Sequence, residues 1–455
     1  MRTSTLYLFA LPLAASLSLN AMAQPLPEAI QSALESHPEL RASASSRLAA
    51  GEDLKAARAG YLPRIDLNAG YGREGTDSPA IRAGGKHWER LTRGESQIRL
   101  GQMVFDGFAT PNEVRRHEAT VNSRAFRVLT TAERIALDTV EAYHEVVKRT
   151  EMVRLAEANL QNHQRIHDQI RLRSERGVSR SADLDQAEAR LALARNNLVT
   201  EKANLMDAEA VYFSVVGRLP DNLMMPGTVA HLLPESLEQA LTLINQNPII
   251  QTAEADRAAA EKQYATTKAP FYPRFDIELS RNFDNDLDGV NGHYNEWQAM
   301  LRMRYNLFSG GRDKARLESS SHQINQAIEI RNNATRQLAE ELRLAWNAMD
   351  SARQQVPIAQ QYVDYTVRVR DSYRQQFNIG DRTLLDLLDS ENELFTAQRR
   401  LTEIRITENF SQYRLLAVAG QLLRSQSIVP PAEAMPLHVA GQSGSDGLAG
   451  LPEGR

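Results

Sequence analysis

The sequence GYLPRID at residues 60–66 returns in altered form as PFYPRFD at residues 270–276. In each copy the proline stands where a helical pattern ends and an alternating, strand-like pattern begins. Upstream, Pro38 and Pro248 are separated by the same 210 positions as Pro63 and Pro273. The chain therefore contains an internal repeat, and this repeat organises the predicted fold.

Matches farther along the chain follow a second, shorter offset. Three of them stand 203 positions apart, namely Phe105-Asp106-Gly107 with Phe308-Ser309-Gly310, Gly177 with Gly380, and Asp183-Leu184 with Asp386-Leu387. The second copy has thus lost seven residues between its two strands. Such a length change belongs in a loop, where deletions are tolerated.

Each copy predicts the order helix, strand, strand, very long helix, glycine turn and long helix. In the first copy these elements are expected at residues 27–59, 64–72, 96–105, 112–175 and 181–216, and the order repeats over residues 235–423. The predicted domains are a signal peptide at 1–23, a first repeat at 24–220, a second repeat at 221–426 and a disordered tail at 427–455. The tail is rich in Pro, Gly and Ser and has no periodic apolar residues.

The first 23 residues have the charged, apolar and small-residue zones of a secretory signal, and cleavage after Ala23 would leave Gln24 first. No later stretch approaches the roughly 18 uncharged residues of a spanning helix, so a membrane crossing would need β-strands. The sequence has no cysteine, which argues against a disulfide, a thiolate zinc site and a lipid-anchored N-terminal cysteine. A net charge of -4 gives no reason to expect nucleic acid as a partner.

The longest predicted helices do not fit a compact domain. Residues 313–376 contain one break-prone residue, Pro357, and at 1.5 Å per residue they would reach roughly 90 Å. Apolar side chains recur at three- and four-residue spacing between polar faces, as at Leu338, Leu342, Trp346 and Met349. A periodic pattern of this length predicts coiled-coil or tube packing.

The predicted strands alternate between apolar and polar side chains. Four strands per chain cannot close a barrel, whereas three chains would supply about twelve strands and a lumen. The predicted fold class is therefore mainly α with a membrane β part: a two-fold internal repeat whose strands contribute to a trimeric 12-strand β-barrel, continued by a long α-helical coiled-coil barrel. In that barrel the lipid-facing residues would be Phe275, Leu279, Trp297, Leu301 and Tyr305, and the lumen-facing residues Arg302 and Arg304.

The repeat, the two proline junctions, FSGG at residues 308–311 and GDRTLLDLLD at residues 380–389 resemble the TolC family of outer-membrane channels. The resemblance covers nearly the whole mature chain. It implies a homotrimer in the outer membrane that extends into the periplasm. The implied partners are a periplasmic adaptor (membrane fusion protein), an inner-membrane ABC transporter, an exported protein substrate and outer-membrane lipid. It implies neither catalysis nor a cofactor.

Within this family, many drug-efflux channels are lipoproteins, whereas the secretion branch generally is not. A chain without cysteine is therefore similar to the type I secretion branch, and its pattern resembles the pores that export large surface adhesins. The predicted function is a passive conduit for protein export. Two alternatives stay open: a multidrug efflux outer-membrane channel, and a periplasmic coiled-coil adaptor or scaffold. Such adaptors usually have one helical hairpin, whereas this sequence predicts two.

The helical pairs are predicted to reverse direction at Gly177 and Gly380, which places these turns at the periplasmic end of the tube. Glycine suits both turns because it tolerates the left-handed conformation that ends a helix. Beyond the second turn, Asp386 and Asp389 share a helix face, and three copies would form two acidic rings that attract cations. The alternative is that Thr383 and Asp386 form a capping pair.

The resemblance adds expectations about a gate at this end of the tube. It implies that Asp386 and Asp389 line the constriction and that Arg382 and Asp183 are the candidate link that holds it shut. Phe377 stands where the best-known member of the family has a tyrosine, so it lacks the hydroxyl for such a link.

Three other patterns carry no predicted site. Asp284 to Gly289 opens like a calcium loop, but Asn295 stands at the closing position, which favours an acidic hairpin loop. His163 and His167 are four apart on a helix without a third ligand, so we expect solvated side chains and no metal site. No catalytic constellation can be placed on a cleft, and an enzyme is not expected.

Overall fold

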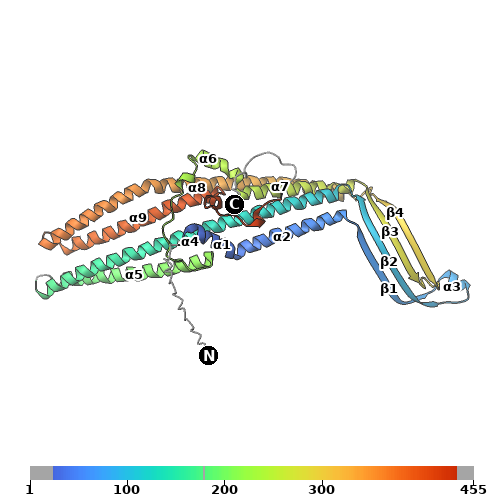
Figure 1. Cartoon of the computed structure of the whole chain (residues 1–455), viewed down its shortest axis with the longest axis horizontal. Coiled ribbons are helices and arrows are strands. Elements are labelled where there is room, and N and C mark those ends of the chain that lie inside the picture. Colours follow the sequence, from blue (N-terminus) through green and yellow to red (C-terminus); the bar gives the residue numbers. More distant parts are fainter. Residues whose placement is uncertain (1–23, 178–179, 438–455) are drawn as a thin grey trace, which may run out of the picture. The chain divides into compact units, whose positions relative to one another are not determined.

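The computed structural model describes residues 24–177 and 180–437 (Figure 1). The predicted signal peptide lies outside the described residues. The chain divides into two compact units, each assembled from three distant segments. We call the first the hairpin unit (Met1–Ser36, Asp138–Val229 and Asp350–Phe410) and the second the sheet unit (His37–Leu137, Ala230–Met349 and Ser411–Arg455).

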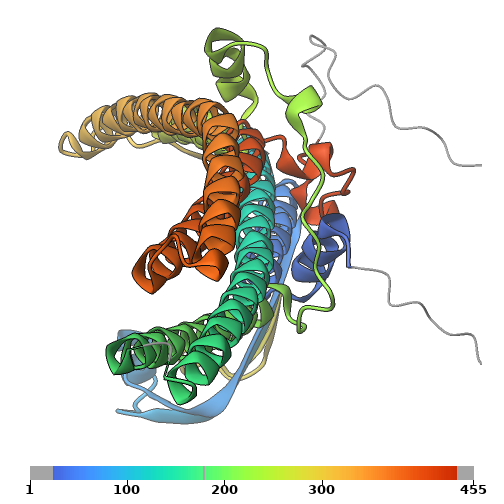
Figure 2. The ribbon, with the colours of Figure 1, turned by 90° about the vertical axis from the view of Figure 1, so that its left-hand side faces the viewer.

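The hairpin unit is built from long helices. It contains α1 (Leu26–Ser36), α5 (Ser181–Val216), and portions of α4 (Ala109–Glu175), α8 (Arg312–Ile379) and α9 (Leu384–Val418). Helix α4 lies beside α5, and α8 lies beside α9, so the unit contains two helical hairpins (Figure 2). Helix α1 packs against α5, where Ser36 Oγ donates to the carbonyl of Val216 at 3.2 Å.

The sheet unit holds the four strands and the remaining helices. The strands are β1 (Arg64–Thr76), β2 (Glu89–Phe105), β3 (Arg274–Asn285) and β4 (His293–Arg304). The α-helices wholly within it are α2 (Pro38–Arg58), α3 (Pro79–Ala83), α6 (Leu237–Thr242), α7 (Pro248–Thr267) and α10 (Leu422–Ser425). Its 3-10 turns are η1 (Ala59–Tyr61), η2 (Ala230–Leu232), η3 (Leu243–Gln246), η4 (Ala269–Phe271) and η5 (Ala432–Ala434).

The sheet has the order β1-β2-β3-β4, and all neighbouring strands are antiparallel (Figure 1). The central pair β2–β3 joins the two repeats. Strands β1 and β2 are longer than predicted, at 13 and 17 residues, because polar segments without clean alternation pair with each other from Gly72↔Arg93 to Thr76↔Glu89. Among the residues that the structure describes, no helix is both long and apolar enough to cross a membrane.

The repeat is visible in the way that matching helices begin. Helices α2 and α7 both carry proline at their first position, preceded by His37 and Asn247 as N-caps. Each cap side chain accepts a hydrogen bond from the N–H two residues later, at Glu39 and Ile249. The single helix predicted at 27–59 is therefore wrong, because the chain changes direction at His37 and Pro38 starts a new helix. Pro357, by contrast, lies inside an unbroken α8.

The apolar stripe predicted on α8 packs in the sheet unit. Leu338, Leu342 and Met349 are buried there, while Trp346 is partly buried at the edge of the cluster. Their buried neighbours are Ala240, Ile244, Ile250, Ala345, Leu415 and Val418. Periodicity thus identified the buried face of this long helix.

The predicted disorder of the tail is wrong for residues 427–437. Ile428 and Ala434 are buried, and the Leu437 N–H donates to Asn122 Oδ1 at 2.6 Å. Leu437 also packs against an apolar cluster that includes Leu54. A few apolar side chains are enough to dock this low-complexity segment, because the surface that receives it is built by distant parts of the chain. Residues 438–455 lie outside the described part.

One buried carboxylate in the sheet unit has no arginine among its hydrogen-bond partners in the described part of the chain. Glu133 of α4 accepts from the N–H groups of Leu422 and Leu423 at 3.1 and 3.4 Å, and so holds the start of α10. Burial raises the pKa of Glu133 from its ordinary 4.5 to about 7, although the two N–H donors oppose the shift. A group whose folded-state pKa is raised contributes stability that is complete below pH 4.5 and is lost as the pH rises through 7.

We therefore expect the thermal unfolding midpoint to decrease as the pH is raised from 5 to 8. Glu133 would account for a loss of about 3 kcal/mol at most in the free energy of unfolding. Glu133→Gln keeps an acceptor oxygen and carries no charge, so it should flatten this dependence and be the more stable form at pH 8. Circular dichroism melts at both pH values measure the effect, with Glu141→Gln, at an exposed position of the same helix, as control. Equal pH dependence in Glu133→Gln and the parent would contradict the assignment.

Candidate functional site

The hairpins end at two glycines with positive φ. Gly177 follows α4 with φ 74°, and Gly380 follows α8 with φ 90°. Apart from the chain neighbours, no heavy atom of the described residues lies within 4 Å of where a Cβ would stand at either position. Backbone conformation, which disfavours a side chain at positive φ, is therefore the reason for glycine at both turns. We call the residues around these two turns the hairpin end.

Asp386 takes part in a reciprocal cap at the start of α9. Its Oδ2 accepts from the Thr383 hydroxyl at 2.8 Å and from the Thr383 N–H at 3.3 Å, while the Asp386 N–H donates back to Thr383 Oγ1 at 3.3 Å. The bond from the Thr383 hydroxyl, helped by the Thr383 N–H and Arg382, lowers the pKa of Asp386. The matching residue Asp183 accepts from the Arg180 N–H at 3.3 Å in the same position of α5.

Asp389 has a different partner. Its Oδ1 lies 3.0 Å from Arg190 Nη2, and this ion pair connects α9 of one hairpin with α5 of the other. The Asp389 side chain is 58% exposed and that of Arg190 is 30% exposed. The two acidic residues on one face of α9 therefore have distinct roles, since Asp386 caps a helix and Asp389 pairs between hairpins.

Arg382 and Phe377 make their contacts close to their own hairpin turn. Arg382 Nε donates to Gln376 Oε1 at 2.9 Å, its Nη1 lies 3.9 Å from Asp386, and its guanidinium lies 4.3 Å from the Tyr373 ring centroid. Phe377 is buried in the core of the hairpin end. That core also contains Ile166, Ile170, Ala187, Leu384, Leu387 and Leu388.

A buried carboxylate in the hairpin unit was missed by the sequence analysis. The Glu391 side chain is 1% exposed and lies 2.6 Å from Arg374, 3.5 Å from Arg370 and 3.0 Å from Asn162 Nδ2. It joins α4, α8 and α9. Its position in the sequence did indicate burial, because Glu391 follows Leu388 by three residues and Leu387 by four and so stands in the apolar stripe of α9.

The expectation of a solvated His163 is wrong. Its side chain is buried, and Nδ1 has no hydrogen-bond partner within the described residues. Burial lowers the pKa of His163, and the nearby Glu391 opposes this shift. This turn of α4 faces the other helices of the unit, which its local sequence did not indicate. His167, one turn later, lies 3.2 Å from Asp168.

The two faces of the sheet differ in chemistry, as the alternation predicted. The register pairs Phe275 with Met303 and Ile277 with Leu301 on one face, and Asp276 with Arg302 on the other. The apolar face is exposed in the single chain, with Leu67 at 70%, Trp297 at 73% and Leu301 at 67%. Tyr305 follows directly after the last residue of β4.

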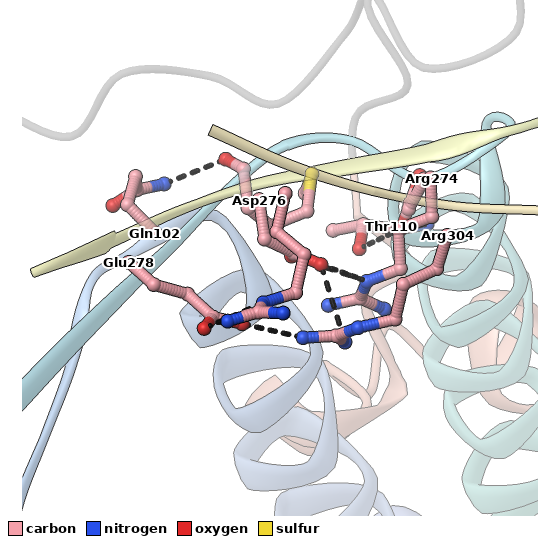
Figure 3. Close-up of polar contacts among 9 residues, drawn as sticks. Gln102, Thr110, Arg274, Asp276, Glu278 and Arg304 are labelled. Atoms are coloured by element: carbon pink, nitrogen blue, oxygen red, sulfur yellow. Dashed lines mark hydrogen bonds and ion pairs between the residues drawn. The ribbon is translucent and has the colours of Figure 1, made fainter. Parts of the chain in front are cut away.

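Charged side chains gather on the polar face where β3 begins and β4 ends (Figure 3). Asp276 lies 2.9 Å from Arg274 Nε and 3.4 Å from Arg304 Nη1. Glu278 lies 2.9 Å from Arg302 Nε and also contacts Arg304. We call these five residues the basic cluster, because it contains three arginines and two carboxylates.

The other end of the polar face is acidic. Neighbouring positions there hold Glu95 and Asp284, with Glu296 one row nearer the middle of the sheet. Arg93 lies 2.9 Å from both Glu74 and Glu95 and 3.1 Å from Asp288. In the connection to β4, Asp286 Oδ1 accepts from the Gly292 N–H at 2.9 Å, which fits the expected acidic hairpin loop. Throughout the described ranges, no three His, Asp or Glu side chains gather closely enough to hold a metal ion.

The sequence and the fold can now be compared with known proteins. The model of the family described as "Outer membrane efflux protein" matches residues 29–217 and 241–421. The outer membrane efflux protein BepC of Brucella suis is 27% identical over 89% of this chain and 87% of its own length. TolC of Escherichia coli is 23% identical over 90% and 86%, and the alkaline protease secretion protein AprF of Pseudomonas aeruginosa is 22% identical over 89% and 86%.

Solved structures show the same fold. The CmeC outer membrane channel of Campylobacter jejuni superimposes with a TM-score of 0.79 at 16% identity, covering 88% of this chain and 86% of that one. The two family matches correspond to the two repeats and together span most of the sequence. The chain therefore belongs to the outer membrane efflux protein family and is an outer-membrane channel of the TolC kind.

Proposed function

We propose that the chain forms a homotrimeric conduit for protein export in a type I secretion system. The observation that carries the trimer is the sheet, in which β1 and β4 each pair with one strand and leave an edge open. Open edges and an exposed apolar face are costly in lipid unless copies of the sheet join into a closed barrel. Three copies would supply about twelve strands, enough for a lumen.

The choice of protein export rests on the relatives. AprF is named for the secretion of alkaline protease, and it aligns with nearly the whole chain. In this proposal a periplasmic adaptor and an inner-membrane ABC transporter deliver the exported protein, and a large surface adhesin is the proposed type of cargo. The second candidate is a multidrug efflux channel, and the description of BepC as an outer membrane efflux protein favours efflux.

We expect a strain that lacks this chain to lose at least one secreted or surface protein and to keep its resistance to small toxic compounds. Comparative proteomics of culture supernatants, alongside growth inhibition assays, measures both. Complementation with the wild-type chain is the control. An unchanged secreted proteome together with increased drug sensitivity would reject protein export in favour of efflux.

In the proposed barrel the apolar face of the sheet contacts lipid, and the polar face contacts water in the lumen. In single-cysteine variants of the cysteine-free chain, a membrane-restricted thiol probe should label positions 297 and 301, whereas a water-soluble probe should label position 298 from the lumen. Trp297, Gln298 and Leu301 belong to one strand, so they make a matched set. The register would be wrong if the membrane-restricted probe labelled 298 and spared 301.

We also propose a gate at the hairpin end. Asp386 and Asp389 would line the constriction as acidic rings, and Arg382 with Asp183 remains the candidate link between protomers that holds it closed. The Arg190–Asp389 ion pair adds a link between the two hairpins of one chain. Because Asp389 is largely exposed, its charge would still reach ions in the lumen despite this pairing.

Purified trimers in planar bilayers test the gate. Asp386→Asn with Asp389→Asn should reduce cation selectivity and block by divalent cations, because the acidic rings lose their charge. Arg382→Ser should raise open conductance. Asp364→Asn, at an exposed position on α8, is a control for general effects of charge. If selectivity and conductance stay unchanged and thermal stability alone falls, the residues serve as helix caps.

A further inference from the structure

We infer that the basic cluster on the polar face of the sheet is a binding site for polyanions that carry carboxylate or phosphate groups. The inference rests on the proposed function, because it takes the polar face to line the lumen of the trimer. It adds a ligand class to the surface where β3 begins and β4 ends.

Burial distinguishes the acidic from the basic members of the cluster. The side chains of Asp276 and Glu278 are 8% and 21% exposed, whereas those of Arg274, Arg302 and Arg304 are 50%, 42% and 55% exposed. The carboxylates are therefore covered counter-ions beneath the arginines. The side chains that the cluster exposes to solvent are therefore mainly those of its arginines.

Charge and geometry both favour an anion. The cluster has three arginines and two carboxylates; Asp106 also acts on Arg274 and Arg99 on Glu278, so the sum remains one positive charge per chain. Three copies would arrange these charges around one axis. Both carboxylates orient the arginines, since Arg304 contacts Asp276 and Glu278 at once. A guanidinium presents several N–H groups in a fixed plane, which matches the oxygens of carboxylate or phosphate and adds affinity through charge-assisted hydrogen bonds.

The rest of the polar face indicates that the excess positive charge is confined to the end that holds the basic cluster. Arg64 stands in the row of Glu278, across Gly101, and is paired with Asp66 at 2.9 Å. In the next row Arg99 lies opposite Asp66 and Ser280. Farther along, the rows hold acidic residues. An anion would therefore be attracted at the helix-proximal end of the face and repelled at the loop end, so the basic cluster is the favourable position on this surface.

Block of ion current by added polyanions tests the site. In trimers in planar bilayers, inorganic tripolyphosphate and a hexa-aspartate peptide added on the helical side should each reduce conductance. Arg302→Gln with Arg304→Gln should raise the half-blocking concentration by about tenfold or more, because charge-assisted hydrogen bonds are lost. Arg281→Gln is the matched control, because Arg281 lies on the opposite face of β3, across from Trp297.

A second variant guards against misfolding of the double variant. Glu278→Gln keeps every arginine and removes one negative charge, so it should lower the half-blocking concentration. Stronger block by the peptide would point to carboxylates of a transported polypeptide, and stronger block by tripolyphosphate to phosphate-bearing solutes. Conducting trimers that show no block, or equal block in the parent, Glu278→Gln and the double variant, would overturn the inference. Failure of the parent to conduct would instead reject the proposed function.

Discussion

The four-stranded sheet imposes the main constraint on this molecule, because one chain leaves its edges open and its apolar face exposed. Strands β1 and β4 end the sheet on either side, and large apolar side chains such as Trp297 and Leu301 are largely exposed. A sheet of this kind is stable when its edges pair and its apolar face meets lipid. Membership of an outer-membrane family agrees with this chemistry.

Buried carboxylates bracketed by arginines recur in both units. Glu391 lies between Arg370 and Arg374 in the hairpin unit, and Asp276 lies between Arg274 and Arg304 in the sheet unit. A buried ion without a partner would be strongly destabilising, so each acid restricts the arrangement of the elements that carry its arginines. The arrangement at Glu391 joins three helices, whereas the one at Asp276 joins two adjacent strands and leaves its arginines exposed.

Glu133 shows what happens without such partners. Its hydrogen bonds come from two backbone N–H groups, and burial keeps its pKa high. The segment that it holds, α10, leads into residues 427–437, which dock against Asn122 and the cluster around Leu54. The same buried polar contact therefore links the C-terminal segment to α4 and makes the stability of that region depend on pH.

The sequence by itself determined the repeat, the long helices, the glycine turns, the polar and apolar sheet faces and the family. These depend on periodicity and turn chemistry, which are local: Leu342 lies in a helical stripe, and Arg302 alternates with Leu301. It also proposed the cap at Asp386, whose partner Thr383 is three residues away. The sequence could not supply the Arg190–Asp389 pair, because these residues are 199 positions apart.

The tertiary structure alone decided which polar residues are buried. His163 looks like an ordinary polar position of an amphipathic helix, and the place of Glu391 in an apolar stripe indicated burial without indicating its partners. The burial of both follows from the helices that pack over them. The docking of residues 427–437 and the cover over Asp276 have the same origin. Burial depends on which distant surfaces meet, and no local pattern of residues records that meeting.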